Sequence, residues 1–215
     1  MEYKRNVIVS NLYETSKSSK GGHLLSSEAD RYEVYDLDQI KDEFCKYYRH
    51  DEKLKSCDAY YYDQRNQLVI EFKNTNYHNL KEYYNEIEIK IVDTHMMLTE
   101  TFYRNKKSTE LSKKLNMLLV YNDTLNYGEG VRRINNALNT MRPIKGNTER
   151  DVSITKTFSD EQEFMEAVGN TKKKYEGQFY KEIQFIGKKD FVTDYVEAGY
   201  FGNLTEWQGM KEAVE

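Results

Sequence analysis

The stretch from residue 56 to residue 75, SCDAYYYDQRNQLVIEFKNT, constrains the fold of this chain more than any other. Residues 57–62 are rich in aromatic side chains, and residues 67–73 alternate apolar and polar side chains, which is typical of β-strands. The residues between them, 63–66, have the composition of a tight polar turn. The sequence therefore predicts a β-hairpin.

Three side chains of this hairpin can take part in chemistry: Asp58, Glu71 and Lys73. Glu71 and Lys73 are two residues apart on one strand, so they point to the same face. A two-residue loop at 65–66 would place Asp58 opposite Lys73, and a four-residue loop at 63–66 would place it opposite Glu71. The two registers differ by two residues, so Asp58 shares the face of the pair in both.

Directly opposite residues have Cβ atoms about 5 Å apart. Two carboxylates at that separation, with an ammonium beside them, are costly unless another charge offsets them. A divalent cation such as Mg²⁺ does so, because it takes carboxylate and carbonyl oxygens and keeps several waters. Lys73 would then orient or deprotonate a metal-bound water. The pattern therefore favours a Mg²⁺ or Mn²⁺ site, although an acidic residue two before a lysine is also typical of a salt-bridged, solvated sheet face.

The arrangement of Asp58, a gap, and then Glu71-Phe72-Lys73 at the end of an apolar strand resembles the PD-(D/E)xK, or restriction-endonuclease-like, nuclease superfamily. In that family the aspartate begins one strand and the (D/E)xK motif ends the next. The resemblance covers roughly residues 36–125. Cys57 stands where the motif that names the family has proline.

The resemblance implies catalytic roles for Asp58, Glu71 and Lys73. It implies that Asp58 and Glu71 ligate Mg²⁺ or Mn²⁺, with the backbone carbonyl of Phe72 completing the shell. Because a helix before the hairpin often carries a glutamate that reaches the metal in this family, it also suggests Glu43 as an auxiliary ligand. The expected substrate is a nucleic acid, DNA rather than RNA.

The elements around the hairpin agree with that family. A helix is expected to begin at Asp36, with Asp36 or Asp38 as its cap. After the hairpin, an apolar stripe predicts a long helix over 79–103, and the apolar run 115–121, LNMLLVY, predicts a buried strand. The order helix, strand, strand, helix, strand implies a right-handed crossover onto one mixed sheet flanked by helices, an α/β fold.

Outside this core the pattern is weaker. Residues 1–35 are expected to be rich in loops, with a short strand at 6–10 and only a polar loop at 15–30. No linker separates residues 126–215, so they are expected to be an α+β elaboration of a single domain spanning 1–215. The expected elements there are a helix at 131–141, a strand at 152–158, a helix at 160–173 with Phe164, Met165 and Val168 facing inward, and a second hairpin formed by 178–186 and 191–196.

The composition limits the setting of the protein. The 215 residues contain no apolar run long enough for a membrane span and no signal peptide at the start, so a cytoplasmic location is expected. Cys45 and Cys57 are the only cysteines and are expected to be reduced thiols. No zinc-ligand spacing, nucleophile elbow or phosphate-binding loop motif is present.

The net charge of −4 is unusual for a protein that binds phosphates, so nucleic-acid binding would depend on local basic clusters. The alternative function is a catalytically inactive nuclease-like fold that binds a protein or a nucleic acid. The acidic total and the 19 tyrosines favour this alternative, because tyrosine is enriched at protein interfaces. The two hypotheses differ in whether Asp58, Glu71 and Lys73 converge in an open cleft or lie on a covered face.

Overall fold

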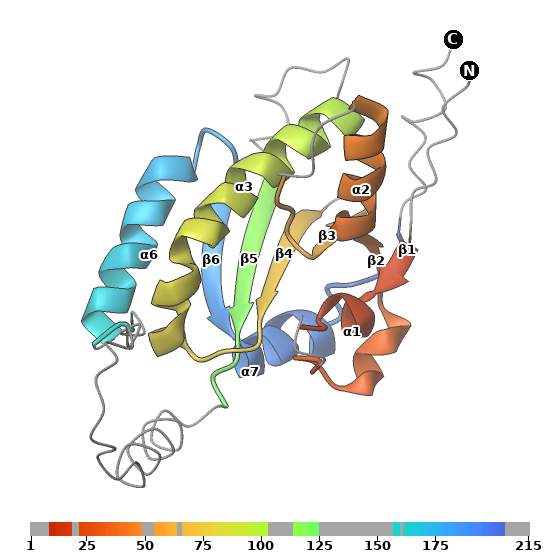
Figure 1. Cartoon of the computed structure of the whole chain (residues 1–215). Coiled ribbons are helices and arrows are strands. Elements are labelled where there is room, and N and C mark those ends of the chain that lie inside the picture. The colour runs from red at the N-terminus through yellow and green to blue at the C-terminus, as the bar shows by residue number, and fades with distance from the viewer. Residues whose placement is uncertain are drawn as a thin grey trace, which may run out of the picture.

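The computed structural model describes residues 9–18, 22–48, 54–63, 66–102, 114–124, 157–159 and 161–204. These residues form an α/β fold in which helices flank a six-stranded mixed sheet (Figure 1). This confirms the expected fold class at that level. The strands are β1 (Val9–Asn11), β2 (Glu33–Asp36), β3 (Ala59–Tyr62), β4 (Gln67–Lys73), β5 (Leu115–Tyr121) and β6 (Glu182–Gly187).

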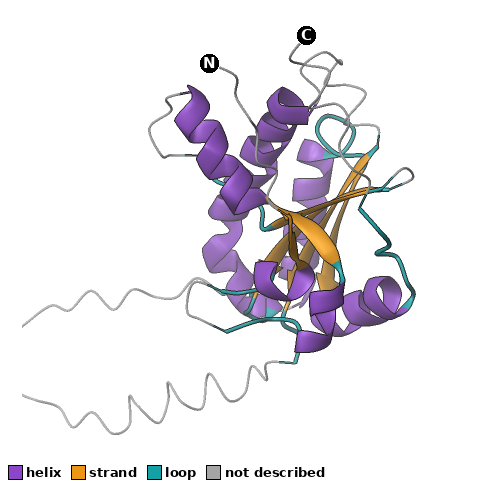
Figure 2. Ribbon diagram, turned by 90° about the vertical axis from the view of Figure 1, so that its right-hand side faces the viewer, coloured by secondary structure: helices purple, strands orange, loops and turns teal. Residues whose placement is uncertain are grey.

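The strands lie in the sheet in the same order as in the sequence. β1 to β4 pair antiparallel, whereas β5 and β6 are added parallel to β4. Helices lie on both sides of the sheet (Figure 2). The helical elements are α1 (Leu12–Thr15), η1 (Ser27–Arg31), α2 (Leu37–Tyr48), η2 (Tyr77–Asn79), α3 (Leu80–Phe102), α6 (Glu161–Tyr175), α7 (Lys188–Phe191) and a π-helical turn, η3 (Val192–Glu197).

Both faces of the sheet are buried, which explains why β5 is almost continuously apolar and why β4 carries the three consecutive apolar residues Leu68, Val69 and Ile70. On one face, Val69 of β4 packs into a core built with α2, α3 and α6. On the other face, Leu68 and Ile70 pack into a second core built with α1, η1, α7 and η3. Glu71 and Lys73 follow Val69 at a spacing of two and therefore belong to the face covered by α2 and α3.

Of the two hairpin registers considered, the structure has the one with the four-residue loop. Tyr62 pairs with Gln67 and Ala59 pairs with Ile70. One further step in this register sets Asp58 opposite Glu71, and the Asp58 N–H donates to the Ile70 carbonyl at 3.0 Å. The hairpin therefore brings the two carboxylates together, with Lys73 on the same face.

One of the helices that cover this face, α2, begins at a capped end. Asp36 caps α2, because its Oδ1 accepts the Gln39 N–H at 3.0 Å. Asp38 is therefore left free of the capping role. α3 is preceded by η2, and the crossover from β4 through α3 to β5 is parallel, as predicted.

The expectation of only a loop over 15–30 is wrong. Ser27–Arg31 form the 3₁₀ helix η1, and Leu24 and Leu25 are buried in the second core. Strand β2 was also missed. Such short elements show no periodicity in the sequence. Of the strand expected at 6–10, the structure describes the end, within β1, and residues 1–8 lie outside the described residues.

The expectation of a second hairpin is also wrong. β6 pairs parallel with β5, and the chain from Lys188 to Glu197 is helical rather than extended. The aromatic and β-branched residues of 191–196 suggested a strand. Phe191 and Val196 instead lie in helical turns and are buried in the second core. Met165 is 58% exposed and does not face inward, unlike Phe164 and Val168. The expectations for 131–141 and for most of 152–158 lie outside the described residues.

Two further expectations concern chemistry and location. Cys45 and Cys57 are both buried free thiols, as expected. Across the described ranges, no helix has the length and apolar character that a membrane span requires.

Candidate functional site

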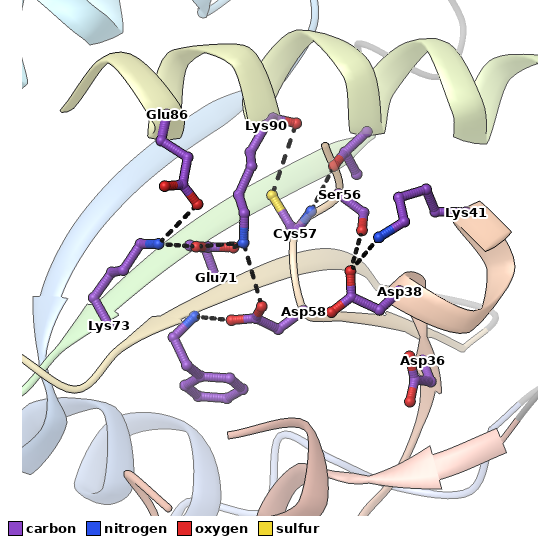
Figure 3. A network of polar contacts seen from close by, with 12 residues as sticks. Asp36, Asp38, Lys41, Ser56, Cys57, Asp58, Glu71, Lys73, Glu86 and Lys90 are labelled. Carbon is purple, nitrogen blue, oxygen red and sulfur yellow. Dashed lines mark hydrogen bonds and ion pairs between the residues drawn. The ribbon is translucent and has the colours of Figure 1, made fainter. Parts of the chain in front are cut away.

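The predicted hairpin residues line one cavity of about 660 Å³ on the sheet face under α3 (Figure 3). Asp58, Glu71 and Lys73 reach it from the strands. Lys90 and Glu86 reach it from α3, and Asp38 reaches it from α2. The structure therefore brings the three predicted catalytic residues together and adds groups that the sequence interpretation had not assigned.

Glu71 is a fully buried carboxylate held by two lysines. The Lys90 Nζ lies 2.9 Å from both Oε1 and Oε2 of Glu71, and the Lys73 Nζ lies 2.9 Å from Oε1. Lys73 is also 3.6 Å from Glu86 Oε1. Charge-assisted hydrogen bonds of this kind are among the strong ones in proteins, so they fix the orientation of the carboxylate.

Asp58 is held from two sides. Its Oδ2 accepts the Phe72 N–H at 2.6 Å, and its Oδ1 lies 3.5 Å from the Lys90 Nζ. One ammonium therefore bridges the carboxylates of Asp58 and Glu71. Phe72 contacts this site through its amide N–H, which positions Asp58.

Burial and the neighbouring Glu71 carboxylate raise the pKa of Asp58 to about 8, against the opposing effect of Lys90 and the Phe72 N–H. Burial disfavours the ammonium of Lys90, but the carboxylates of Glu71 and Asp58 outweigh it and raise the Lys90 pKa. Burial and the neighbouring Lys90 disfavour the ammonium of Lys73 as well, but the carboxylates of Glu71 and Glu86 outweigh them and raise the Lys73 pKa. Strongly shifted groups in a cavity are typical of functional sites.

Asp38 is a further carboxylate at the cavity. It accepts a hydrogen bond from Ser56 Oγ at 2.6 Å and one from Lys41 Nζ at 3.0 Å. Burial alone would raise its pKa, but these two hydrogen bonds and the positive charge of Lys41 lower it. Asp38 therefore adds negative charge to the α2 side of the cavity.

Glu43, suggested as an auxiliary ligand, is not among the residues that line the cavity. It pairs with Lys46 at 2.7 Å on α2. Five residues separate it from Asp38, which is about 140° around a helix, so the two cannot share a face. The helix before the hairpin does contribute a carboxylate, but from Asp38.

Lys90 was missed by the sequence interpretation. The available signal was its spacing of four from Glu86, which puts both on one face of α3 beside the buried residues Ile87 and Ile91. A polar pair next to an apolar stripe is usually solvated, and only the packing of α3 over β4 turns it toward the hairpin.

The donor set suits a hard divalent cation in part. Mg²⁺ is commonly bound by one or two carboxylates together with water and substrate phosphates, and Asp58 and Glu71 can supply two. Within the part of the chain that the structure describes, however, no three His, Cys, Asp or Glu side chains are grouped closely enough to hold a metal ion. The position between the two carboxylates holds the ammonium of Lys90.

No family model matches the chain, and no curated protein and no solved structure matches it.

Proposed function

We propose that this protein is a metal-dependent nuclease that hydrolyses nucleic-acid phosphodiester bonds, with a site of the PD-(D/E)xK type. One observation carries the proposal: the carboxylates of Asp58 and Glu71 both contact the ammonium of Lys90 inside a cavity that Lys73 also lines. The order α2, β3, β4, α3, β5 supports it, because it is similar to the restriction-endonuclease-like core.

In this proposal Asp58 and Glu71 hold Mg²⁺ or Mn²⁺, and the Phe72 N–H keeps Asp58 in place. The ion would supply Lewis acidity and an activated water when bound. Lys73 orients the attacking water or balances charge on the phosphate. Its ammonium lies between Glu71 and Glu86 and 5.2 Å from the centre of the Tyr83 ring, which limits its movement.

The proposed substrate is a nucleic acid, DNA rather than RNA. Lys17 and Lys73 line the cavity and would face its phosphates. The chain has a net charge of −4, and carboxylates outnumber lysines in the cavity lining, so attraction of a phosphate to this cavity would depend on the bound divalent cation.

The alternative is a catalytically inactive nuclease-like fold that binds a protein or a nucleic acid. One observation favours it: the ammonium groups of Lys73 and Lys90 form ion pairs with the carboxylates of Asp58 and Glu71. Such a cluster is electrostatically complete, so it needs no metal for the fold.

Cleavage of labelled DNA and RNA, with Mg²⁺ or Mn²⁺ and with EDTA, tests the proposal. Asp58→Asn is the informative variant, because the amide keeps the Phe72 hydrogen bond and removes the charge. Asp93→Asn is its matched control: Asp93 Oδ2 also accepts a backbone N–H, from Lys55 at 2.9 Å, but lies outside the cavity lining.

The expected result is metal-dependent cleavage by the wild type and Asp93→Asn, and none by Asp58→Asn. If the folded wild type cleaves none of the substrates with either metal, the binding module becomes the better account. Equal cleavage by Asp58→Asn would remove the proposed site.

A further inference from the structure

Lys90 lies where the proposed function requires a metal ion. Its Nζ is 2.9 Å from both oxygens of Glu71 and 3.5 Å from Asp58 Oδ1. We infer that Lys90 is a resident counter-ion that holds these two carboxylates in the metal-free protein and must leave that position before a divalent cation can bind. This inference rests on the proposed metal site and concerns what sets the affinity of that site for a divalent cation.

The geometry makes the two cations competitors. Mg²⁺ requires its ligand oxygens at about 2.0–2.1 Å in nearly octahedral geometry. Both oxygens of Glu71 are already engaged by the Lys90 ammonium, and Oε1 is engaged by Lys73 as well. An ion between Asp58 and Glu71 would therefore meet the ammonium at close range.

Lys90 is built into this position. Its side chain is 12% exposed, and it descends from α3 onto strands β3 and β4. Lys73 also contacts Glu71, but it has a second carboxylate partner in Glu86 and does not reach Asp58 in the described contacts. Lys90 alone among the described residues contacts both proposed ligands, so it is the group that exchanges with the ion.

Charge explains how exchange is possible. When both carboxylates are ionised, the charges of Asp58, Glu71, Lys73 and Lys90 sum to zero, so the cluster needs no metal to balance its charge. The ammonium sits at the end of a flexible four-carbon stem and lines an open cavity of about 660 Å³ into which it can move. The cost of moving it is subtracted from the binding free energy of the metal.

The test is a Mn²⁺ titration of the full chain, with free Mn²⁺ measured by electron paramagnetic resonance. Lys90→Met removes the ammonium and keeps an unbranched side chain. The expected result is an affinity for Mn²⁺ higher by at least about tenfold, which is about 1.4 kcal/mol, because the competing cation is gone. Lys81→Met is the matched control: it removes an ion-paired lysine of the same helix that lies outside the cavity lining, and it should leave Mn²⁺ affinity unchanged.

Lys90→Met leaves two carboxylates without their ammonium, so circular dichroism must show that it folds. A second measurement avoids this requirement by using the wild type. Acylation of lysines, followed by mass spectrometry, should modify Lys90 slowly in the metal-free protein and faster once Mn²⁺ is present. Lys81 should be modified at the same rate in both conditions.

The outcomes separate this inference from the proposed function. If the wild type binds Mn²⁺ but Lys90→Met binds it no more tightly, or Lys90 acylation does not change with Mn²⁺, the inference is wrong and the metal site stands. If neither protein binds Mn²⁺, the metal site itself is wrong, and both proposals end together.

Discussion

Glu71 is the charge at the centre of the site, because it is fully buried and both of its oxygens are bonded to ammonium groups. A buried charge without its partners would cost several kcal/mol. The two lysines therefore have different roles. Lys90 holds both carboxylates, whereas Lys73 touches Glu71 through one oxygen and faces the cavity.

Lys73→Ala should lower cleavage by at least about a hundredfold, as expected when a positioned charge that stabilises the transition state is removed. Fold and Mn²⁺ binding should remain, because Lys90 still bonds both oxygens of Glu71. Cleavage rates, circular dichroism and Mn²⁺ titration check this together. Full activity of the variant would remove Lys73 from the mechanism.

Glu71→Gln should be strongly destabilising. The amide cannot balance the two ammonium groups, and breaking a buried ion pair in this way costs about 3–5 kcal/mol. Glu88→Gln is the control, because Glu88 pairs with Lys174 at an exposed site, where a pair contributes at most about 1 kcal/mol. Urea unfolding measures both. A similar small loss for the two variants would contradict the buried network.

At the scale of elements, the sequence predicts best where burial makes the pattern strong. The bounds of β4 and β5 agree with the predicted 67–73 and 115–121, because alternation marks the first strand and a continuous apolar run marks the second. The hairpin register stayed open between two loop lengths, since both keep Asp58 on the same face. The helical segment 188–197 was missed because its residue types suit strands as well.

The site residues could likewise be predicted only where the local sequence pattern determines their position. Asp58, Glu71 and Lys73 could be grouped from strand parity alone. Lys90 could not be assigned, because its role depends on how α3 lies over the hairpin, which spacing within the helix does not specify. Asp38 was considered only as a cap, and it reaches the cavity because Asp36 takes that role.

His95 shows how tightly α3 is packed against the C-terminal part of the chain. Its ring meets the rings of Phe179 and Tyr180 edge-on, and burial lowers its pKa from 6.5 to about 4. The unfolded chain binds a proton near pH 6.5, whereas the folded protein does not until about pH 4. Between these values the unfolded state binds more protons, so the free energy of unfolding falls as the pH falls.

The loss attributable to His95 over this window is roughly 3 kcal/mol. His95→Gln, which does not titrate, should lack this part of the pH dependence. Urea unfolding of both proteins between about pH 7 and pH 4 measures it, and the stability difference should move in favour of the variant as the pH falls. Parallel stability curves would show that His95 does not titrate differently on folding.

At the scale of the whole molecule, the sheet is assembled from strands of all parts of the chain. β1 and β2 precede the stretch that resembles the nuclease core, and β6 follows it. Both faces of the sheet are covered, and the charged cluster lies on one of them beneath α3. All the proposed chemistry therefore lies in one cavity, where we propose that a divalent cation binds between Asp58 and Glu71.

Thermal unfolding with increasing Mn²⁺, in the presence of a short DNA oligonucleotide, tests that claim most directly. A ligand that binds only the folded state adds about 2.7 kcal/mol at a hundred times its dissociation constant, which gives a visible rise in Tm. The account predicts this rise for the wild type and Asp93→Asn, and its loss in Asp58→Asn. An equal rise in Asp58→Asn, or none in the wild type at millimolar Mn²⁺, would contradict it.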